Sequence, residues 1–155
     1  MTRVLVIGYG NPLRSDDGVG WRIAEGLRQE WGDSISVLTG QHLVPEWASE
    51  LAAADVVFLV DASVSSRGPL RLRRITPSDA RTPLLDGHTL APLDLVRLAT
   101  EVYGHQPVMY LLSVPAEDFA FGESLSPLAQ SRAAGAVKLL NRRLAGLLQS
   151  QRRVG

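Results

Sequence analysis

The chain has 155 residues, no cysteine and a formal net charge of zero, from 16 basic and 16 acidic side chains. This length is typical of one domain with a sizeable core, and the charge balance argues against a nucleic-acid-binding protein, which usually carries a basic surface. The lack of cysteine excludes disulfide bonds, thiolate metal ligands and a cysteine nucleophile. We therefore expect a single domain over residues 1–155.

No apolar run in the sequence approaches the length that spans a bilayer. The first apolar run starts at Val4, which leaves no room for a signal peptide before it. We therefore expect a cytoplasmic protein that interacts with neither membrane nor nucleic acid, and a monomer is the favoured state.

Apolar runs and helical stripes alternate along the first half of the chain. Residues 4–7 are continuously apolar, as in a strand buried on both faces of a parallel sheet. The helix expected next has an apolar stripe with a spacing of four, formed by Val19, Ile23, Leu27 and Trp31. Residues 35–39 predict a second strand, and Pro45 suits the first position of a short helix. Residues 56–60 are the most apolar strand, and they end at Asp61.

The second half of the chain continues the alternation after one exception. Residues 70–75 alternate aliphatic and arginine side chains, which predicts a half-exposed edge strand, and residues 76–87 are polar and predict a loop. A helix between Pro92 and Gly104 is expected to turn Leu95, Ala99 and Val102 inward. Residues 108–114 predict a fifth strand. Ser126-Pro127 is expected to begin a long amphipathic helix. These elements predict an α/β fold, a three-layer α/β/α sandwich with a mostly parallel sheet.

The loop after the first strand is the most informative segment, with the sequence GYGNPLRSDDGVG over residues 8–20. Loops at the carboxyl ends of parallel strands are where such sheets bind ligands. Gly8 and Gly10 begin like a dinucleotide-binding fingerprint, but Leu13 occupies the place of its third glycine, and two adjacent acids would repel a pyrophosphate. No Gly-Lys-Ser/Thr phosphate-binding loop occurs either. The loop therefore indicates a cation site rather than a phosphate site.

Two further residues are candidates to complete this cation site. Asp17 follows the first strand and Asp61 ends the third, so both belong to one rim of the sheet. His88 joins them only if the segment between residues 63 and 87 folds back. Two carboxylates and an imidazole suit a divalent transition metal such as nickel, zinc, iron or cobalt, and three protein ligands leave positions open for water or substrate.

Several of these residues also have ordinary structural explanations. Asp16 or Asp17 can cap the following helix, and we favour Asp16 as the cap and Asp17 as the ligand. Gly18 and Gly20 indicate either close approach of a substrate backbone or tight packing of helix on sheet. His42 is a weaker candidate ligand. Another histidine, at position 105, is expected in a turn at the opposite rim, and no serine lies in a nucleophile-elbow sequence.

The motifs together resemble those of the [NiFe]-hydrogenase maturation endopeptidases. The sequence GYGNPLRSDDGVG resembles the N-terminal signature of that family, VDA at residues 60–62 its second acidic motif, and His88 its histidine motif. The sequence FGESLSP at residues 121–127 resembles the segment before the last helix of the family. The first motif is long and specific. Each of the other three is weak alone, but together they occur in the order found in the family.

The resemblance implies a fold, a site and an activity. The fold would be a five-stranded mixed sheet in the order 2-1-3-5-4, with residues 70–75 antiparallel. Asp17, Asp61 and His88 would be the metal-coordinating and catalytic residues, with Asp17 a shorter variant where the family has Glu or Asp. The chain would remove the C-terminal extension of a [NiFe]-hydrogenase large-subunit precursor, and the cofactor would be nickel supplied by that precursor, or another divalent metal in its absence.

Two other classes of protein stay open at this stage. A non-catalytic metal-binding or precursor-binding maturation chaperone would use the same fold and rim without cutting its partner. A small-molecule hydrolase would act on amides or esters with no protein partner.

Overall fold

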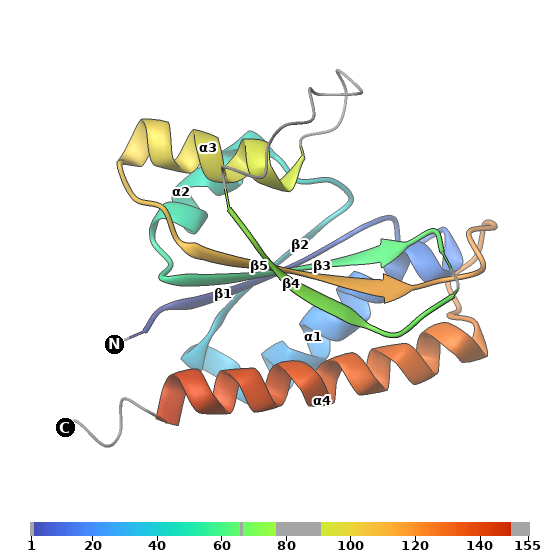
Figure 1. Cartoon of the computed structure of the whole chain (residues 1–155). Helices are drawn as coiled ribbons and strands as arrows, with labels where there is room; N and C mark the ends of the chain where they lie inside the picture. Colours follow the sequence, from blue (N-terminus) through green and yellow to red (C-terminus); the bar gives the residue numbers. More distant parts are fainter. Residues whose placement is uncertain (1, 66, 77–90, 150–155) are drawn as a thin grey trace.

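The computed structural model of the chain describes residues 2–65, 67–76 and 91–149. They form three layers, in which a five-stranded sheet lies between helices α1 and α4 on one face and α2 and α3 on the other (Figure 1). The strands are β1 (Val4–Tyr9), β2 (Ser36–Gly40), β3 (Val56–Ser63), β4 (Arg71–Ile75) and β5 (Val108–Pro115). The helices are α1 (Val19–Trp31), α2 (Ala48–Ala52), α3 (Pro92–Tyr103) and α4 (Pro127–Gln149). The α/β/α sandwich is thus confirmed.

The strand order is β2-β1-β3-β5-β4, which confirms the order implied by the resemblance. Neighbouring strands are parallel except β4, which runs antiparallel to β5 at one edge. The alternation of aliphatic and arginine side chains over residues 70–75 therefore predicted an edge strand correctly, and the antiparallel direction implied by the resemblance is confirmed. The parallel strands β1, β3 and β5 end at a common rim, which is the expected place for a ligand site.

The hydrophobic core has two halves because the strands are buried on both faces. Along β3, Phe58 and Val60 pack with α1 and α4, whereas Val57 and Leu59 pack with α2 and α3. This strict alternation also fixes the direction of the next residue, since Asp61 must point to the same face as Leu59. The alternation along β3 thus places the carboxylate of Asp61 on the face of the sheet that α2 and α3 cover.

The helices follow the predicted stripes with two corrections. Val102 was expected to face inward on α3 but is 61% exposed, because Val96 packs into the core with Leu95 and Ala99 and the helix ends before another inward turn. Pro45 begins a short 3₁₀ turn, Pro45–Trp47, and the α-helix starts only after it.

Two predictions fall on residues that the structure does not describe. These are the loop expected over residues 76–87, of which only Thr76 lies inside the described ranges, and the candidate ligand His88. No helix within the described ranges is long and apolar enough to cross a membrane.

Candidate functional site

The candidate site lies at the rim where β1, β3 and β5 end. Strand β3 does not stop at Val60, as the apolar run suggested, but continues to Ser63, so Asp61 is held within the ladder. Asp61 pairs in register with Ser113 of β5, and its Oδ2 accepts a hydrogen bond of 3.2 Å from the hydroxyl of Tyr9 on β1. Strand β5 therefore fixes the backbone of Asp61, and Tyr9 of β1 fixes its carboxylate.

Burial makes Asp61 an unusual carboxylic acid. The pKa of Asp61 is raised to about 6, mainly by burial and also by the negative charge of Asp17, while the hydrogen bond from Tyr9 acts in the opposite direction. Burial and the charge of Asp61 likewise raise the pKa of the Tyr9 phenol above its ordinary value, so Tyr9 stays a hydrogen-bond donor. A carboxyl group with a pKa near neutrality, held in place by a donor, is suited to proton transfer.

Asp17 reaches the same rim from the loop after β1. It lies in a 3₁₀ turn, Ser15–Gly18, and its Oδ2 accepts a hydrogen bond of 2.7 Å from the backbone N–H of Asn11. The loop is tightly folded: Gly10 has φ +140°, and a Cβ atom there would lie 2.0 Å from the carbonyl oxygen of Asp17. The two acids that the sequence placed on one rim thus interact electrostatically in the folded protein, as the raised pKa of Asp61 indicates.

The role expected for Asp16 was wrong, because its carboxylate makes no capping hydrogen bond to α1. Its side chain is fully buried and accepts four hydrogen bonds from the segment that follows β5. The donors are the backbone N–H groups of Glu117 and Asp118, both at 3.0 Å, and the N–H and hydroxyl of Ser126, both at 2.7 Å. Burial alone would raise the pKa of Asp16, but these hydrogen bonds outweigh it and lower the pKa.

Asp16 is therefore the residue that orders the loop, and sequence reasoning missed this role. Ser126 caps α4 through a hydrogen bond from the N–H of Ala129 to its hydroxyl oxygen, so Asp16 holds the start of a helix other than its own. Backbone hydrogen bonds reinforce the same connection: the N–H of Ser15 donates to Gly122 and the N–H of Gly122 donates to Leu13, both at 2.8 Å. The only sequence signal was the adjacency of two acids, one of which had to point away from the site.

Close packing of the chain on itself accounts for three glycines of the motif. A Cβ atom on Gly8 would lie 2.2 Å from the carbonyl oxygen of Gly20, and one on Gly20 would lie 2.7 Å from the carbonyl oxygen of Val60. A Cβ atom on Gly18 would lie 2.8 Å from the Cα atom of Pro12. These contacts bring the start of α1 against β1 and β3, which places Asp17 beside Asp61.

The third expected ligand, His88, lies outside the described residues. Within the described ranges, no three His, Asp or Glu side chains form a group that could hold a metal ion. His42 is exposed, and His105 lies at the opposite rim, where its Nε2 is 2.9 Å from the carbonyl oxygen of Ala54. The structure thus brings Asp17 near Asp61, and the assignment of these two residues with His88 as the metal and catalytic set stays a prediction.

Comparison with known proteins gives two curated relatives. A 98-residue stretch is 32% identical to the hydrogenase 2 maturation protease of Escherichia coli strain K12, covering 60% of this chain and 57% of that protein. A 145-residue stretch is 27% identical to the hydrogenase expression/formation protein HupD of Thiocapsa roseopersicina, covering 88% of this chain and 65% of that protein. The chain therefore spans less than two thirds of the length of either relative. No model of a known protein family matches it.

Comparison of structures extends the likeness to nearly the whole chain. The hydrogenase maturating endopeptidase HybD from Escherichia coli superimposes with a TM-score of 0.76 at 25% sequence identity. The superposition covers 94% of this chain and 93% of that one.

Proposed function

We propose that the chain belongs to the family of hydrogenase maturation proteases, to which it is similar in sequence and in fold, and that it is an endopeptidase that matures a hydrogenase. Its substrate is the precursor of a [NiFe]-hydrogenase large subunit in the cytoplasm, from which it removes the C-terminal extension. The observation that carries this proposal is the meeting of Asp17 and Asp61 at the rim after β1 and β3. The specific motif of the sequence builds one side of that rim.

The two carboxylates account for recognition of a nickel ion that arrives in the precursor. Negative charges held near each other destabilise one another, and the raised pKa of Asp61 reflects this together with burial. A divalent cation between Asp17 and Asp61 relieves that repulsion, and His88 is the proposed third ligand. Since the chain has no cysteine, any thiolate ligand of the nickel comes from the substrate.

In this proposal Asp61 acts first as a ligand. Its pKa is about 6 in the metal-free protein, so its carboxyl group is largely ionised at pH 7 and can accept the cation, whose charge favours the ionised form. Tyr9 donates a hydrogen bond to Asp61 Oδ2, and a backbone hydrogen bond from Ala62 also favours the ionised carboxylate. Asp17, held by the N–H of Asn11, positions the bound chain.

The test is processing of a nickel-loaded precursor, followed by intact-protein mass spectrometry. Wild type shortens the precursor, and Asp61→Asn leaves its mass unchanged while keeping the circular dichroism spectrum of the folded protein. Asp55→Asn is the matched control, because Asp55 immediately precedes the same strand, lies at the opposite rim and pairs with the exposed Arg3 at 3.2 Å. This control variant retains processing.

An uncut precursor in the presence of folded wild type counts against the peptidase. If that precursor nevertheless binds tightly, the non-catalytic maturation chaperone becomes the better description. Cleavage of small amides or esters without any protein partner would instead favour the small-molecule hydrolase.

A further inference from the structure

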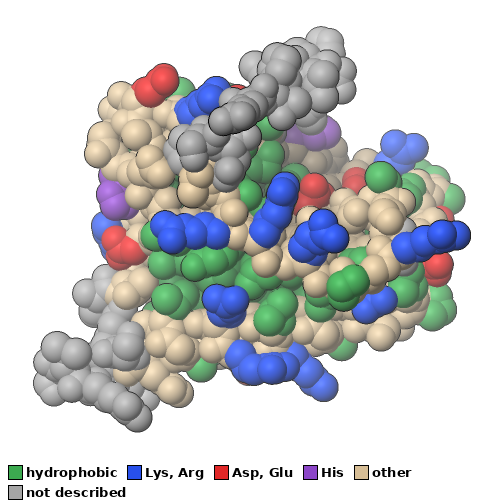
Figure 2. Space-filling model, in the orientation of Figure 1, with side chains coloured by type: hydrophobic (Ala, Val, Ile, Leu, Met, Phe, Trp, Pro, Cys, Tyr) green, Lys and Arg blue, Asp and Glu red, His purple; other side chains and the backbone are tan. Residues whose placement is uncertain are grey.

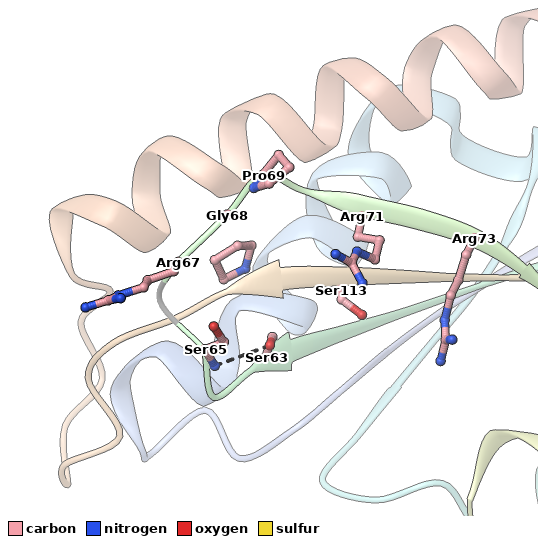
Figure 3. Close-up of a pocket in the computed structure, with 9 residues that line it drawn as sticks. Ser63, Ser65, Arg67, Gly68, Pro69, Arg71, Arg73 and Ser113 are labelled. Atoms are coloured by element: carbon pink, nitrogen blue, oxygen red, sulfur yellow. Dashed lines mark hydrogen bonds between the residues drawn. The ribbon is translucent and has the colours of Figure 1, made fainter.

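A basic pocket lies beside the candidate site, at the same end of the sheet. It has a volume of about 330 Å³ and is formed where β3 and β5 end and β4 begins. Figure 3 shows the side chain of Arg71 directed toward Ser113, with Ser63 on the next strand. The remaining lining residues are Ser65, Arg67, Gly68, Pro69, Arg73 and Pro115.

The sheet register connects this pocket with Asp61. Arg71 pairs with Ser113, and Ser113 pairs with Asp61, so the three residues form one row across β4, β5 and β3. Their side chains leave the same face of the sheet, because residues paired in register share a face. Neighbouring strands are about 4.8 Å apart, which places the Cα atoms of Arg71 and Asp61 about 10 Å from each other. Arg73, two residues further along β4, points to the same face.

Arg71 and Arg73 of the pocket form no ion pair within the described ranges. The ion pairs within the described ranges join Arg3 with Asp55 and Arg28 with Glu25, and neither involves Arg71 or Arg73. Both side chains are exposed, and basic side chains gather on the face seen in Figure 2, along the edge of the sheet that β4 forms. A guanidinium group binds a carboxylate through two parallel hydrogen bonds, and serine hydroxyls add further donors.

We propose that this pocket binds a carboxylate of the peptide substrate, with Arg71 and Arg73 as the charged ligands and the hydroxyls of Ser63 and Ser113 as additional donors. The proposal rests on the proposed function, since it assumes that a peptide lies along the rim. An extended peptide advances about 3.3 Å per residue, so the 10 Å spacing corresponds to about three residues. The carboxylate recognised is then an acidic side chain, or the chain end, within about three residues of the bond that meets Asp61.

The neighbouring arginine on the same strand provides a matched control. Arg74 is also exposed, but it pairs with Tyr110 and leaves the opposite face of the sheet, so it does not line the pocket. Arg74→Gln therefore changes the net charge by the same amount as Arg71→Gln without touching the pocket. Any difference between the two variants reports local binding rather than a general effect of charge.

The experiment is a titration of the ¹⁵N-labelled full chain with three six-residue peptides, followed by NMR. The first peptide has blocked ends and one Glu, the second has Gln in its place, and the third has Gln and a free C-terminal carboxylate. We expect the Glu peptide to shift the amide signals of Ser63, Ser113 and Arg71 and to bind at least about tenfold more tightly than the Gln peptide. The third peptide shows whether a chain end is accepted as well as a side chain.

The variants decide the proposal independently of any cleavage. Arg71→Gln and Arg73→Gln each weaken binding of the Glu peptide about tenfold, and Arg74→Gln leaves it unchanged. Equal binding of all three peptides, equal loss in Arg74→Gln, or shifts by inorganic phosphate with none by the peptides would overturn it. Because binding is measured without a precursor, carboxylate binding with no processing in the mass assay would refute the peptidase and leave the anion pocket standing.

Discussion

Truncation of the buried carboxylate by Asp16→Ala should strongly destabilise the protein. The wild-type carboxylate accepts hydrogen bonds from the N–H groups of Glu117, Asp118 and Ser126 and from the Ser126 hydroxyl. A buried donor left without a partner costs about 1–3 kcal/mol. Glu117 and Asp118 are exposed residues whose N–H groups can recruit water, so mainly the two donors of Ser126 count in full. We expect a loss of about 3–5 kcal/mol in the free energy of unfolding.

The assay is urea denaturation followed by circular dichroism, with Asp118→Ala as the matched control. Asp118 is an exposed acid of the same segment whose carboxylate accepts one hydrogen bond, from the N–H of Ala120 at 3.0 Å. Loss of this hydrogen bond in Asp118→Ala should lower the free energy of unfolding by about 0.5–1 kcal/mol. If Asp16→Ala costs no more than Asp118→Ala, the four hydrogen bonds do not hold the loop and the account of the motif given above is wrong.

The dependence of stability on pH provides a second check on Asp16. Because the pKa of Asp16 is lower in the folded protein than its ordinary value, ionisation of Asp16 favours folding. This contribution is complete above the ordinary pKa of about 4 and is lost as the pH falls through the folded pKa. The difference in stability between wild type and Asp16→Ala should therefore shrink below pH 4, and a constant difference would contradict the assignment.

Three further changes test other parts of the site. Asp61→Asn in metal-free protein should raise the free energy of unfolding at pH 8 by roughly 1–3 kcal/mol and have little effect below pH 4. The reason is that an acid whose folded pKa is about 6 destabilises the folded protein when it is ionised. An unchanged free energy of unfolding at pH 8 would refute the argument that burial raises this pKa. Gly20→Ala should lower the free energy of unfolding by more than about 2 kcal/mol in the same urea assay. Gly26→Ala is the control on the same helix, because the nearest atom is 3.8 Å from a new Cβ there. This control should raise the free energy of unfolding by about 0.5–1 kcal/mol. Asp17→Asn should weaken the binding of nickel at least about tenfold in isothermal titration calorimetry, and equal affinity would remove Asp17 from the proposed ligand set.

The fold could be predicted well because its signals are local and repeated. The apolar runs of residues 4–7 and 56–60 have the composition of buried parallel strands, and the arginines of residues 70–75 indicate an exposed edge. Val102 was misplaced because Leu95 and Ala99 can share a buried face of the helix with either Val96 or Val102. Packing against the sheet buries Val96 and leaves Val102 exposed. Such a choice depends on how the helix is rotated against the sheet, which its own sequence does not determine.

The site was less predictable because its contacts join distant parts of the chain. Sheet topology was enough to put Asp17 and Asp61 on one rim. The donors of Asp16 come from a segment about a hundred residues later, and nothing in the local sequence of either segment indicates their contact. The hydrogen bond from Tyr9 to Asp61 was missed for the same reason, since a Tyr at the end of a strand has no local feature that assigns it a carboxylate partner.

The hydrogen bonds of Asp16 also set the order in which the chain can acquire its site. Asp16 is separated by 101 to 110 residues from its donors Glu117, Asp118 and Ser126. During synthesis, the loop that carries Asp17 is made early, but the groups that hold its neighbour emerge only after β5. A growing chain therefore has both acids of the rim before it has the donors that hold Asp16. We expect the loop around Asp16 to become ordered only when the start of α4 docks.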